Sequence, residues 1–289
     1  MITRSIFESE HEQFGDSVRK FFVTHAVPYH EEWESAGQID RKLWNLAGEY
    51  GLLAPSVPEN YGGVEVDFRY NVVVVEEAAR LGLSGVGFFL HSDITVPYLI
   101  NHGSESQKQR YLPSCVTGET ILAIAMTEPG AGSDLQGIQS TAVKHGDEYV
   151  INGAKTFITC GIQSDLVIVA CKTDPKAGAK GISLFLVEAG TEGFSKGRNL
   201  KKVGMKAQDT AELVFADVRV PAENLLGEEN KGFIYLMNEL PQERLSIAVG
   251  ALASAESILN QTIEYVKDRK AFGKRLADLQ NTQFELADM

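Results

Sequence analysis

A glycine-rich turn is the part of this sequence whose residue types most plainly offer chemistry. Residues 123–134 run from a short apolar segment into Gly130 and Gly132, which are followed by Ser133. Glycines free the backbone amides of such a turn, and amides and small hydroxyl groups can wrap an anionic or carbonyl-rich ligand. A dinucleotide fingerprint would need a third glycine, but Leu135 stands there and no helical pattern follows. The turn predicts a ligand-binding loop outside the Rossmann class, with a plain structural turn as the alternative.

Glu243 is a second candidate, because a carboxylate whose pKa is raised by burial can take a proton from a substrate. Pro241 lies two residues earlier and predicts a helix that begins near it. An acid in the first turn of a helix can also simply stabilise the helix dipole. The residues alone leave the catalytic and the structural interpretations open.

Composition restricts the partners of this chain. It has 289 residues and a net charge of −12, so its average surface repels nucleic acid and anionic membranes. The most apolar runs, such as Leu166–Cys171, are far too short to span a membrane. We expect no nucleic-acid partner and no membrane insertion, and an anionic substrate would have to be held by local donors.

The N-terminal segment and the cysteines predict the compartment. Residues 1–14 have no apolar signal core and carry acids early, which is unlike a secretory or organelle-targeting segment. Cys115, Cys160 and Cys171 lack the paired spacing of a zinc site, and the histidines also lack metal-ligand spacing. We expect reduced thiols, no metal and a cytoplasmic location.

Three regions of different periodicity predict an α+β multidomain fold. Residues 1–122 have the apolar spacing of helices and are expected to form an N-terminal α-helical domain. Residues 123–227 hold short strands without helices between them, which favours a middle antiparallel β-barrel or sandwich domain. The helical period returns over residues 228–289 and continues to Met289 without a stop signal, so that a partial sequence is expected.

Local patterns make these expectations specific. Asp40 can cap the helix that follows it. Val72–Leu81 is rich in β-branched residues, but its acidic continuation favours a buried helix. The pair Asn152-Gly153 between two apolar runs predicts a hairpin with a type I′ turn. Further strands are predicted at Leu166–Cys171, Ile182–Val187 and Ala211–Phe215.

Several segments occur in the order and spacing of acyl-CoA dehydrogenases, and the chain resembles that family over essentially its whole length. These segments are PENYGG (58–63), SESQKQRYLP (104–113), MTEPGAGSD (126–134), NGAKTFIT (152–159), KAQDTAELVF (206–215) and DRKAFGK (268–274). Residues 239–245 (ELPQERL) are most similar to the long-chain branch. The resemblance implies a C-terminal four-helix-bundle domain, of which residues 228–289 would be the truncated start.

The resemblance also implies FAD as the cofactor. The residues of this chain at the matching positions are Met126, Thr127, Ser133, Phe157, Ile158 and Thr159, and, toward the FAD of a neighbouring subunit, Arg269, Phe272 and Gln280. Phe157 stands where many relatives have tryptophan, and either ring can stack on a flavin. Arg269 would meet the diphosphate charge; without the resemblance it would be read as a solvated helix residue.

Glu243 would, by the same resemblance, be the base that takes the α proton of a fatty acyl-CoA thioester while the β hydride passes to flavin N5. Its backbone amide would donate to the thioester carbonyl. The other expected substrate contacts are Ser133, Pro241, Gln242 and Arg244, with Ala179 and Lys180 near the CoA head group. For Lys180, a solvated charged loop is the more favoured interpretation.

Other functions stay open at this point. One is a flavin monooxygenase or nitroalkane-type oxidase of the same fold, and another is a non-catalytic relative. A third is an inactive fragment, because the resemblance places further bundle helices and much of a tetramer interface beyond Met289. The resemblance further implies a homotetramer in the full-length form, an electron-transfer flavoprotein as acceptor, and straight medium-to-long acyl chains.

Overall fold

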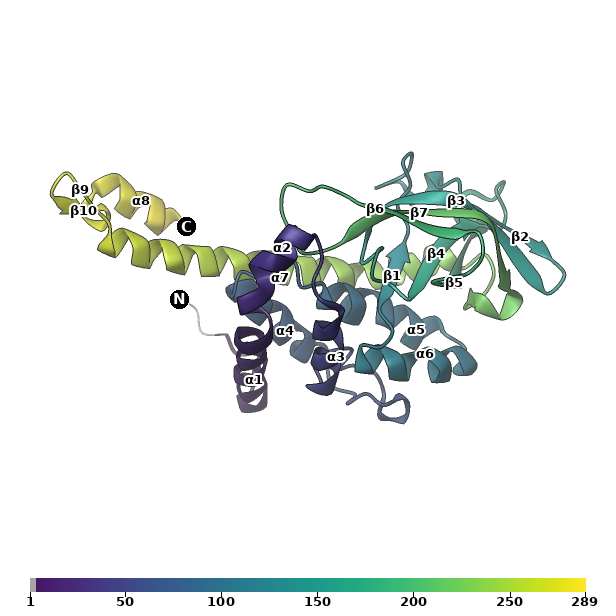
Figure 1. The fold of residues 1–289 in the computed structure, drawn as a ribbon, viewed down its shortest axis with the longest axis horizontal. Coiled ribbons are helices and arrows are strands. Elements are labelled where there is room, and N and C mark those ends of the chain that lie inside the picture. Colours follow the sequence, from purple (N-terminus) through teal and green to yellow (C-terminus); the bar gives the residue numbers. More distant parts are fainter. Residues whose placement is uncertain (1–3) are drawn as a thin grey trace.

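The computed structural model describes residues 4–289, and Figure 1 shows how its parts are arranged. A group of helices from the N-terminal half lies against a β-sheet domain formed by the middle of the chain. The long helix α7 (Gly232–Asp268) passes alongside both and projects beyond them. Its far end carries the small hairpin of β9 (Lys270–Ala271) and β10 (Lys274–Arg275), followed by α8 (Gln280–Asp288). The α+β fold class expected from the sequence is confirmed.

The N-terminal region is helical, as predicted. Its helices are α1 (Ser9–His25), α2 (His30–Ala36), α3 (Arg41–Glu49), α4 (Phe68–Arg80), the π-helical segment Leu90–Thr95, α5 (Val96–His102) and α6 (Glu105–Thr117). Asp40 caps α3 by accepting a hydrogen bond from the amide of Lys42 at 2.9 Å. The β-branched segment that begins at Val72 lies in helix α4 and not in a strand, so the preference for a buried helix is confirmed.

The middle region forms an eight-stranded sheet. Its strands are β1 (Leu122–Ala125), β2 (Thr141–His145), β3 (Glu148–Thr159), β4 (Leu166–Lys172), β5 (Ile182–Glu188), β6 (Phe194–Asn199), β7 (Thr210–Pro221) and β8 (Leu225–Leu226). The order is β6-β7-β3-β2-β4-β5-β8, with β1 beside β4. Most neighbours are antiparallel, as expected, but β4 pairs in parallel with β1 and, through its last residue, with the start of β2.

The hairpin predicted at Asn152-Gly153 is wrong. β3 runs straight through both residues, and the chain reverses earlier, between His145 and Glu148. The Asn152 side chain donates to Asp217 Oδ1 at 3.0 Å and accepts from the Asp217 amide at 2.8 Å. A Cβ at Gly153 would overlap with Ser140. The Asn-Gly pair therefore lies at a β-bulge between β3 and β7, where Gly153 leaves room for the close approach of Ser140.

The helix that carries Glu243 begins at Gly232, so the prediction of a start near Pro241 is wrong. Pro241 lies inside α7, and Glu243 is not in a first turn. The interpretation of Glu243 as an acid that stabilises the start of a helix therefore fails, because the helix dipole acts only near the helix ends.

Two further expectations concern the cysteines and membranes. Cys115, Cys160 and Cys171 are buried and free, as predicted. Among residues 4–289 there is no helix with the length and apolarity to cross a membrane. The expectation for the N-terminal segment falls in part on residues 1–3, which lie outside the described residues.

Candidate active site

Glu243 is a buried carboxylate on α7. Only 7% of the residue is exposed, and the hydroxyl of Tyr98 on α5 donates to its Oε1 at 2.7 Å. Burial raises the pKa of Glu243, and the nearby Glu239 raises it further, against the opposing effects of the Tyr98 hydrogen bond and Arg244. A carboxylate with a raised pKa in a partly enclosed site is suited to proton abstraction.

A second carboxylate, Glu239, lies one turn earlier on the same face of α7. Its Oε1 accepts hydrogen bonds from Asn101 Nδ2 at 3.0 Å and His102 Nε2 at 2.9 Å. The His102 ring stacks on Tyr235, with 4.1 Å between ring centroids. Glu239 is thus held by two donors, whereas Glu243 has a single side-chain donor within the described residues. Of the two carboxylates, Glu243 therefore has fewer side-chain hydrogen bonds.

An apolar cavity of about 300 Å³ lies between α4 and the middle of α7, which pack against each other. Its α7 wall is made of Ser246, Ile247, Gly250, Ala251 and Ser254, and its α4 wall of Val74, Val75, Ala78 and Ala79. Glu243 lies one turn before Ile247, on the stripe that continues through Gly250 and Ser254. The same helix face therefore carries a buried carboxylate and, next to it, an apolar cavity.

The glycine-rich loop after β1 is fastened to β3. The amide of Thr156 donates to the carbonyl of Thr127 at 2.9 Å. Lys155, whose side chain is fully buried, donates to Glu128 Oε1 at 2.8 Å and to the carbonyl of Met126 at 3.1 Å. Burial by itself would raise the pKa of Glu128, but hydrogen bonds from Lys155 and from the segment at Ser140 outweigh it and hold the pKa below its ordinary value. The loop is thus fixed in place beside the adjacent strand.

Phe157 follows this contact in an unusual conformation. Its backbone has φ of 57°, in the left-handed region, and the residue is 69% exposed. The register of β3 with β7 shifts between Lys155 and Ile158. Ile158 is buried and Thr159 half-buried. An exposed aromatic ring on a strained backbone is a common feature of ligand sites, and it offers a flat surface for stacking.

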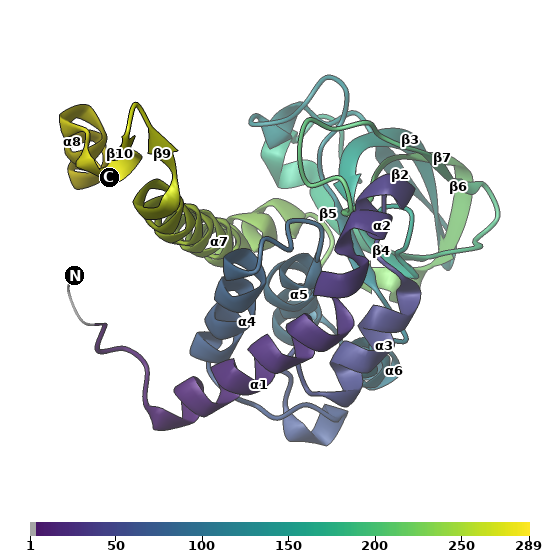
Figure 2. The same ribbon diagram turned by 60° about the vertical axis from the view of Figure 1, so that its left-hand side comes forward.

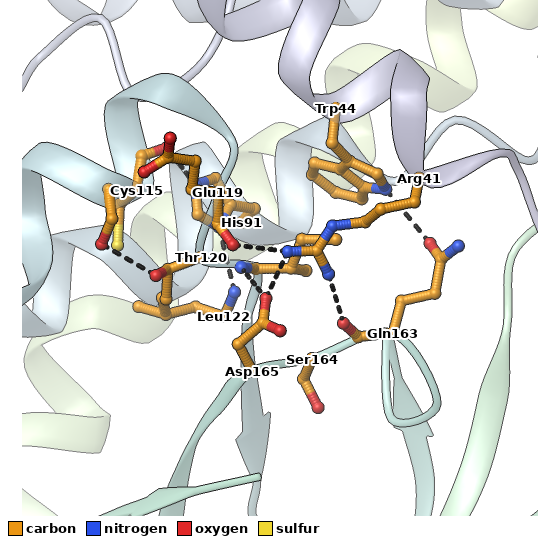
Figure 3. Close-up of polar contacts among 12 residues, drawn as sticks. Arg41, Trp44, His91, Cys115, Glu119, Thr120, Leu122, Gln163, Ser164 and Asp165 are labelled. Carbon is orange, nitrogen blue, oxygen red and sulfur yellow. Dashed lines mark hydrogen bonds and ion pairs between the residues drawn. The ribbon is translucent and has the colours of Figure 1, made fainter.

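The start of β1 is anchored to the helices by a polar network (Figure 3). The Arg41 guanidinium of α3 donates to Asp165 Oδ2 at 2.6 Å and to the carbonyl of Gln163 at 3.0 Å. Asp165 accepts the amide of Ile121 at 2.8 Å. Because β1 leads directly into Met126 and Thr127, this network determines where the glycine-rich loop lies relative to the helices.

His91 adds a second anchor to β1. Its Nδ1 accepts the amide of Leu122 at 3.1 Å, so its Nε2 carries the proton and donates to the carbonyl of Cys115 at 3.0 Å. Burial lowers the pKa of His91 to about 4, which keeps the ring neutral near pH 7. Both ring nitrogens are thus occupied in joining the helices to the sheet.

The predicted substrate residues fall into two groups. Ala179 and Lys180 lie in the 3₁₀ turn Gly178–Gly181, which packs beside the turn Leu135–Gly137 that follows the exposed Ser133. The structure thus brings the two turns together, with Ser133 two residues before the first of them. Next to Glu243, Pro241 and Arg244 are exposed, whereas Gln242 donates to the carbonyl of Asp93 at 2.8 Å.

Arg269 is the C-cap of α7, Phe272 lies between β9 and β10, and Gln280 begins α8. These elements are well separated from the β-sheet domain (Figure 2). Phe272 is 98% exposed and has φ of 54°. Within this single chain they do not join the glycine-rich loop or Glu243. They remain predicted contacts toward another subunit.

Sequence reasoning did not identify Tyr98, Lys155 and Glu128 as parts of the site. Glu128 and Lys155 lie within the segments MTEPGAGSD and NGAKTFIT, and opposite charges in two such neighbouring motifs were a usable signal. Tyr98 is 145 positions from Glu243, and no local pattern marks their contact.

Comparison with protein-family models assigns nearly the whole chain. Residues 8–119 match the acyl-CoA dehydrogenase N-terminal domain, residues 123–218 the middle domain and residues 230–289 the C-terminal domain. The chain belongs to the acyl-CoA dehydrogenase family. Family membership makes it an oxidoreductase of the acyl-CoA dehydrogenase class.

Individual relatives agree. The chain is 54% identical over 288 residues to the mitochondrial long-chain specific acyl-CoA dehydrogenase of Sus scrofa, covering 99% of this chain and 67% of that protein. An acyl-CoA dehydrogenase structure from Geobacillus kaustophilus matches with a TM-score of 0.97 and 55% identity, over 99% of this chain and 76% of that one. An acyl-CoA dehydrogenase from Bacillus anthracis complexed with FAD matches with a TM-score of 0.93 and 35% identity, over 99% of this chain and 49% of that one. The chain spans about two thirds of the length of the long-chain relative.

Proposed function

We propose that this acyl-CoA dehydrogenase uses FAD to convert a saturated fatty acyl-CoA thioester into the trans-2-enoyl-CoA, with Glu243 as the base. The observation that carries the proposal is the position of Glu243: a buried carboxylate of raised pKa on the helix face that lines an apolar cavity. A fatty acyl chain in that cavity would bring its thioester end toward the carboxylate. The 54% identity to a long-chain acyl-CoA dehydrogenase favours this activity over an oxidase or a non-catalytic relative.

The residues around the glycine-rich loop fit a flavin. Cβ atoms added at Gly130 or Gly132 would meet no other atom, so that part of the loop is open to a ligand. Phe157 presents an exposed ring, and Met126 and Thr127 are half-buried at the base of the loop. We assign these residues, with Ser133, Ile158 and Thr159, to FAD. When bound, FAD supplies the acceptor for the β hydride.

Glu243 acts through its side chain. Its position inside α7 commits the backbone amide to the helix, where each N–H donates to the carbonyl four residues earlier. The expected bond from this amide to the thioester carbonyl is therefore not part of the proposal. The carboxylate removes the α proton, and the apolar walls of the cavity hold the acyl chain beside it.

Several finer assignments belong to the same proposal. The Ser133 loop and the turn with Ala179 and Lys180 would hold the CoA moiety, and a straight medium-to-long chain would occupy the cavity. Arg269, Phe272 and Gln280 would complete the FAD site of a neighbouring subunit in a homotetramer. An electron-transfer flavoprotein as acceptor and a cytoplasmic location remain predictions; the Sus scrofa relative is mitochondrial by name.

The proposal is tested by recording the visible spectrum of the FAD-loaded protein before and after anaerobic addition of a long-chain acyl-CoA. The wild-type flavin band is expected to bleach. Glu243→Gln should bind the same ligand and bleach about 10²- to 10⁴-fold more slowly, because it lacks the general base. Glu256→Gln, the same change at an exposed position further along α7, is the matched control and should retain most of the rate.

Each other outcome has a definite meaning. Bleaching of Glu243→Gln at the wild-type rate would remove Glu243 from the mechanism. A wild-type protein that binds FAD and acyl-CoA but never bleaches would contradict the dehydrogenase function. Rapid reoxidation of the reduced flavin by oxygen would instead support the oxidase alternative.

A further inference from the structure

Tyr98 makes the only side-chain hydrogen bond that reaches Glu243 among the described residues. The tyrosine is fully buried in α5, and its hydroxyl lies 2.7 Å from Glu243 Oε1. No hydrogen bond to the other carboxylate oxygen, Oε2, occurs within residues 4–289. A buried tyrosine hydroxyl needs an acceptor, and here the acceptor is one oxygen of the proposed base.

A second contact between α5 and α7 lies beside the Tyr98–Glu243 hydrogen bond. His102 lies one turn after Tyr98 on α5, and Glu239 lies one turn before Glu243 on α7. Tyr98 bonds Glu243, and His102 bonds Glu239 at 2.9 Å. In each helix the two contact residues are four positions apart, and they pair in opposite order along the chain. The Glu239–His102 contact therefore helps to hold α5 and α7 in the alignment that places Tyr98 beside Glu243.

The Tyr98 hydroxyl also opposes the effects that raise the pKa of Glu243. Burial and Glu239 both favour the protonated form of Glu243, whereas the Tyr98 hydrogen bond and Arg244 favour the ionised form. Arg244 is exposed, so its effect is weakened by solvent. His102, the remaining titratable group of α5 at this contact, is occupied by Glu239. Tyr98 is thus the buried donor that keeps the carboxylate available as a base.

We propose that Tyr98 is a positioning residue for the dehydrogenation, which orients the Glu243 carboxylate through Oε1 and leaves Oε2 to receive the α proton. This inference rests on the proposed function. The proton moves from the α carbon to Oε2, and the C–H bonding pair stays with the substrate. The protonated Glu243 keeps Oε1 as a carbonyl acceptor, so the Tyr98 hydrogen bond is present before and after the transfer.

The test is the variant Tyr98→Phe, which removes only the hydroxyl. With ¹³C-carboxyl-labelled glutamate, the Glu243 signal is identified by its absence in Glu243→Gln and titrated by NMR without flavin. We expect the Glu243 pKa in Tyr98→Phe to be about one unit above wild type, because a hydrogen bond to an ionised group is lost. In the FAD-loaded protein, the pH at which flavin reduction is half-maximal should rise by the same amount, and the rate should recover at high pH.

Tyr61→Phe is the matched control. The Tyr61 hydroxyl donates to Glu105 at 2.7 Å, elsewhere in the helical region. This variant should leave both the Glu243 titration and the pH profile unchanged.

The inference is overturned if Tyr98→Phe titrates like wild type, or if its reduction rate falls equally at every pH, as a merely structural role predicts. Failure of the proposed function looks different. In that case the wild-type flavin does not bleach, or Glu243→Gln bleaches normally, and Tyr98 then has no base to position.

Discussion

The buried ammonium group of Lys155 on β3 joins Glu128 Oε1, at 2.8 Å, to the carbonyl of Met126, at 3.1 Å. Glu128 in turn accepts amides from Gln139 and Ser140. One buried pair therefore ties three segments together: the glycine-rich loop, the start of β2 and the strand that bears Phe157. The shape of the proposed flavin site depends on this pair.

Replacing Lys155 by methionine should destabilise the fold by about 3–5 kcal/mol, because Glu128 would be left as an uncompensated buried charge. The measurement is the free energy of unfolding in urea at pH 7. The double variant Lys155→Met/Glu128→Gln is the control and should recover part of the loss. A single variant as stable as wild type would show that the pair carries no structural constraint.

Phe157 allows binding and stability to be separated. Its φ of 57° suits glycine better than alanine, so Phe157→Gly should be more stable than Phe157→Ala by about 1 kcal/mol. Both variants should bind FAD more weakly than wild type because they lack the ring, whereas Phe157→Trp should retain binding. Unfolding in urea and a fluorescence titration with FAD give the two quantities. Unchanged FAD affinity in Phe157→Ala would show that the ring does not contact the flavin.

The sequence predicts best the elements that depend on local signals or on uniform burial. Asp40 caps α3 from a purely local signal, and β4 and β5 are short apolar runs buried on both faces. The Asn152-Gly153 pair misled because its local preference for a turn competes with contacts from Asp217 and Ser140, which lie elsewhere in the chain. The start of α7 was misplaced because Pro241, a common first residue of helices, is tolerated inside this one.

The residues of the candidate site also differ in whether a local sequence pattern indicates them. Glu243 could be selected as a candidate base because it lies in a segment similar to the long-chain branch. Its partner Tyr98, and the polar network of Arg41 and Asp165, arise from tertiary contacts across 145 and 124 positions, and no periodicity encodes them. The left-handed backbone of Phe157 is also invisible in the sequence, because a phenylalanine gives no local signal for that conformation.

Asp93 makes stability depend on pH. It is buried in the π-helical segment Leu90–Thr95, where Asn71 donates to it at 2.6 Å, and burial raises its pKa to about 7. The folded protein thus holds a proton that the unfolded chain releases above the ordinary aspartate pKa of 3.8. The stability that this proton contributes is fully present below pH 3.8 and is lost as the pH rises to about 7.

Asp93→Asn lacks this titration. Its stability relative to wild type should therefore increase between about pH 4 and pH 7, by up to about 4 kcal/mol, and the difference should stay constant above pH 7. Urea unfolding of both proteins at a series of pH values measures this. A difference that is the same at every pH would show that Asp93 is already ionised in the folded protein.

Ala251 offers a direct test of the cavity between α4 and α7 as the acyl site. Ala251 lines that cavity and is not buried in the hydrophobic core. Ala251→Leu should therefore fill part of the cavity and leave the packing of the core unchanged. The preferred acyl chain should become shorter, with kcat/KM falling about fourfold for each methylene that loses its contact. Ala248→Leu is the matched control, because Ala248 is exposed on the same helix outside the cavity wall. Flavin-reduction rates over a series of acyl-CoA lengths measure the shift, and equal profiles for the two variants would place the acyl chain elsewhere.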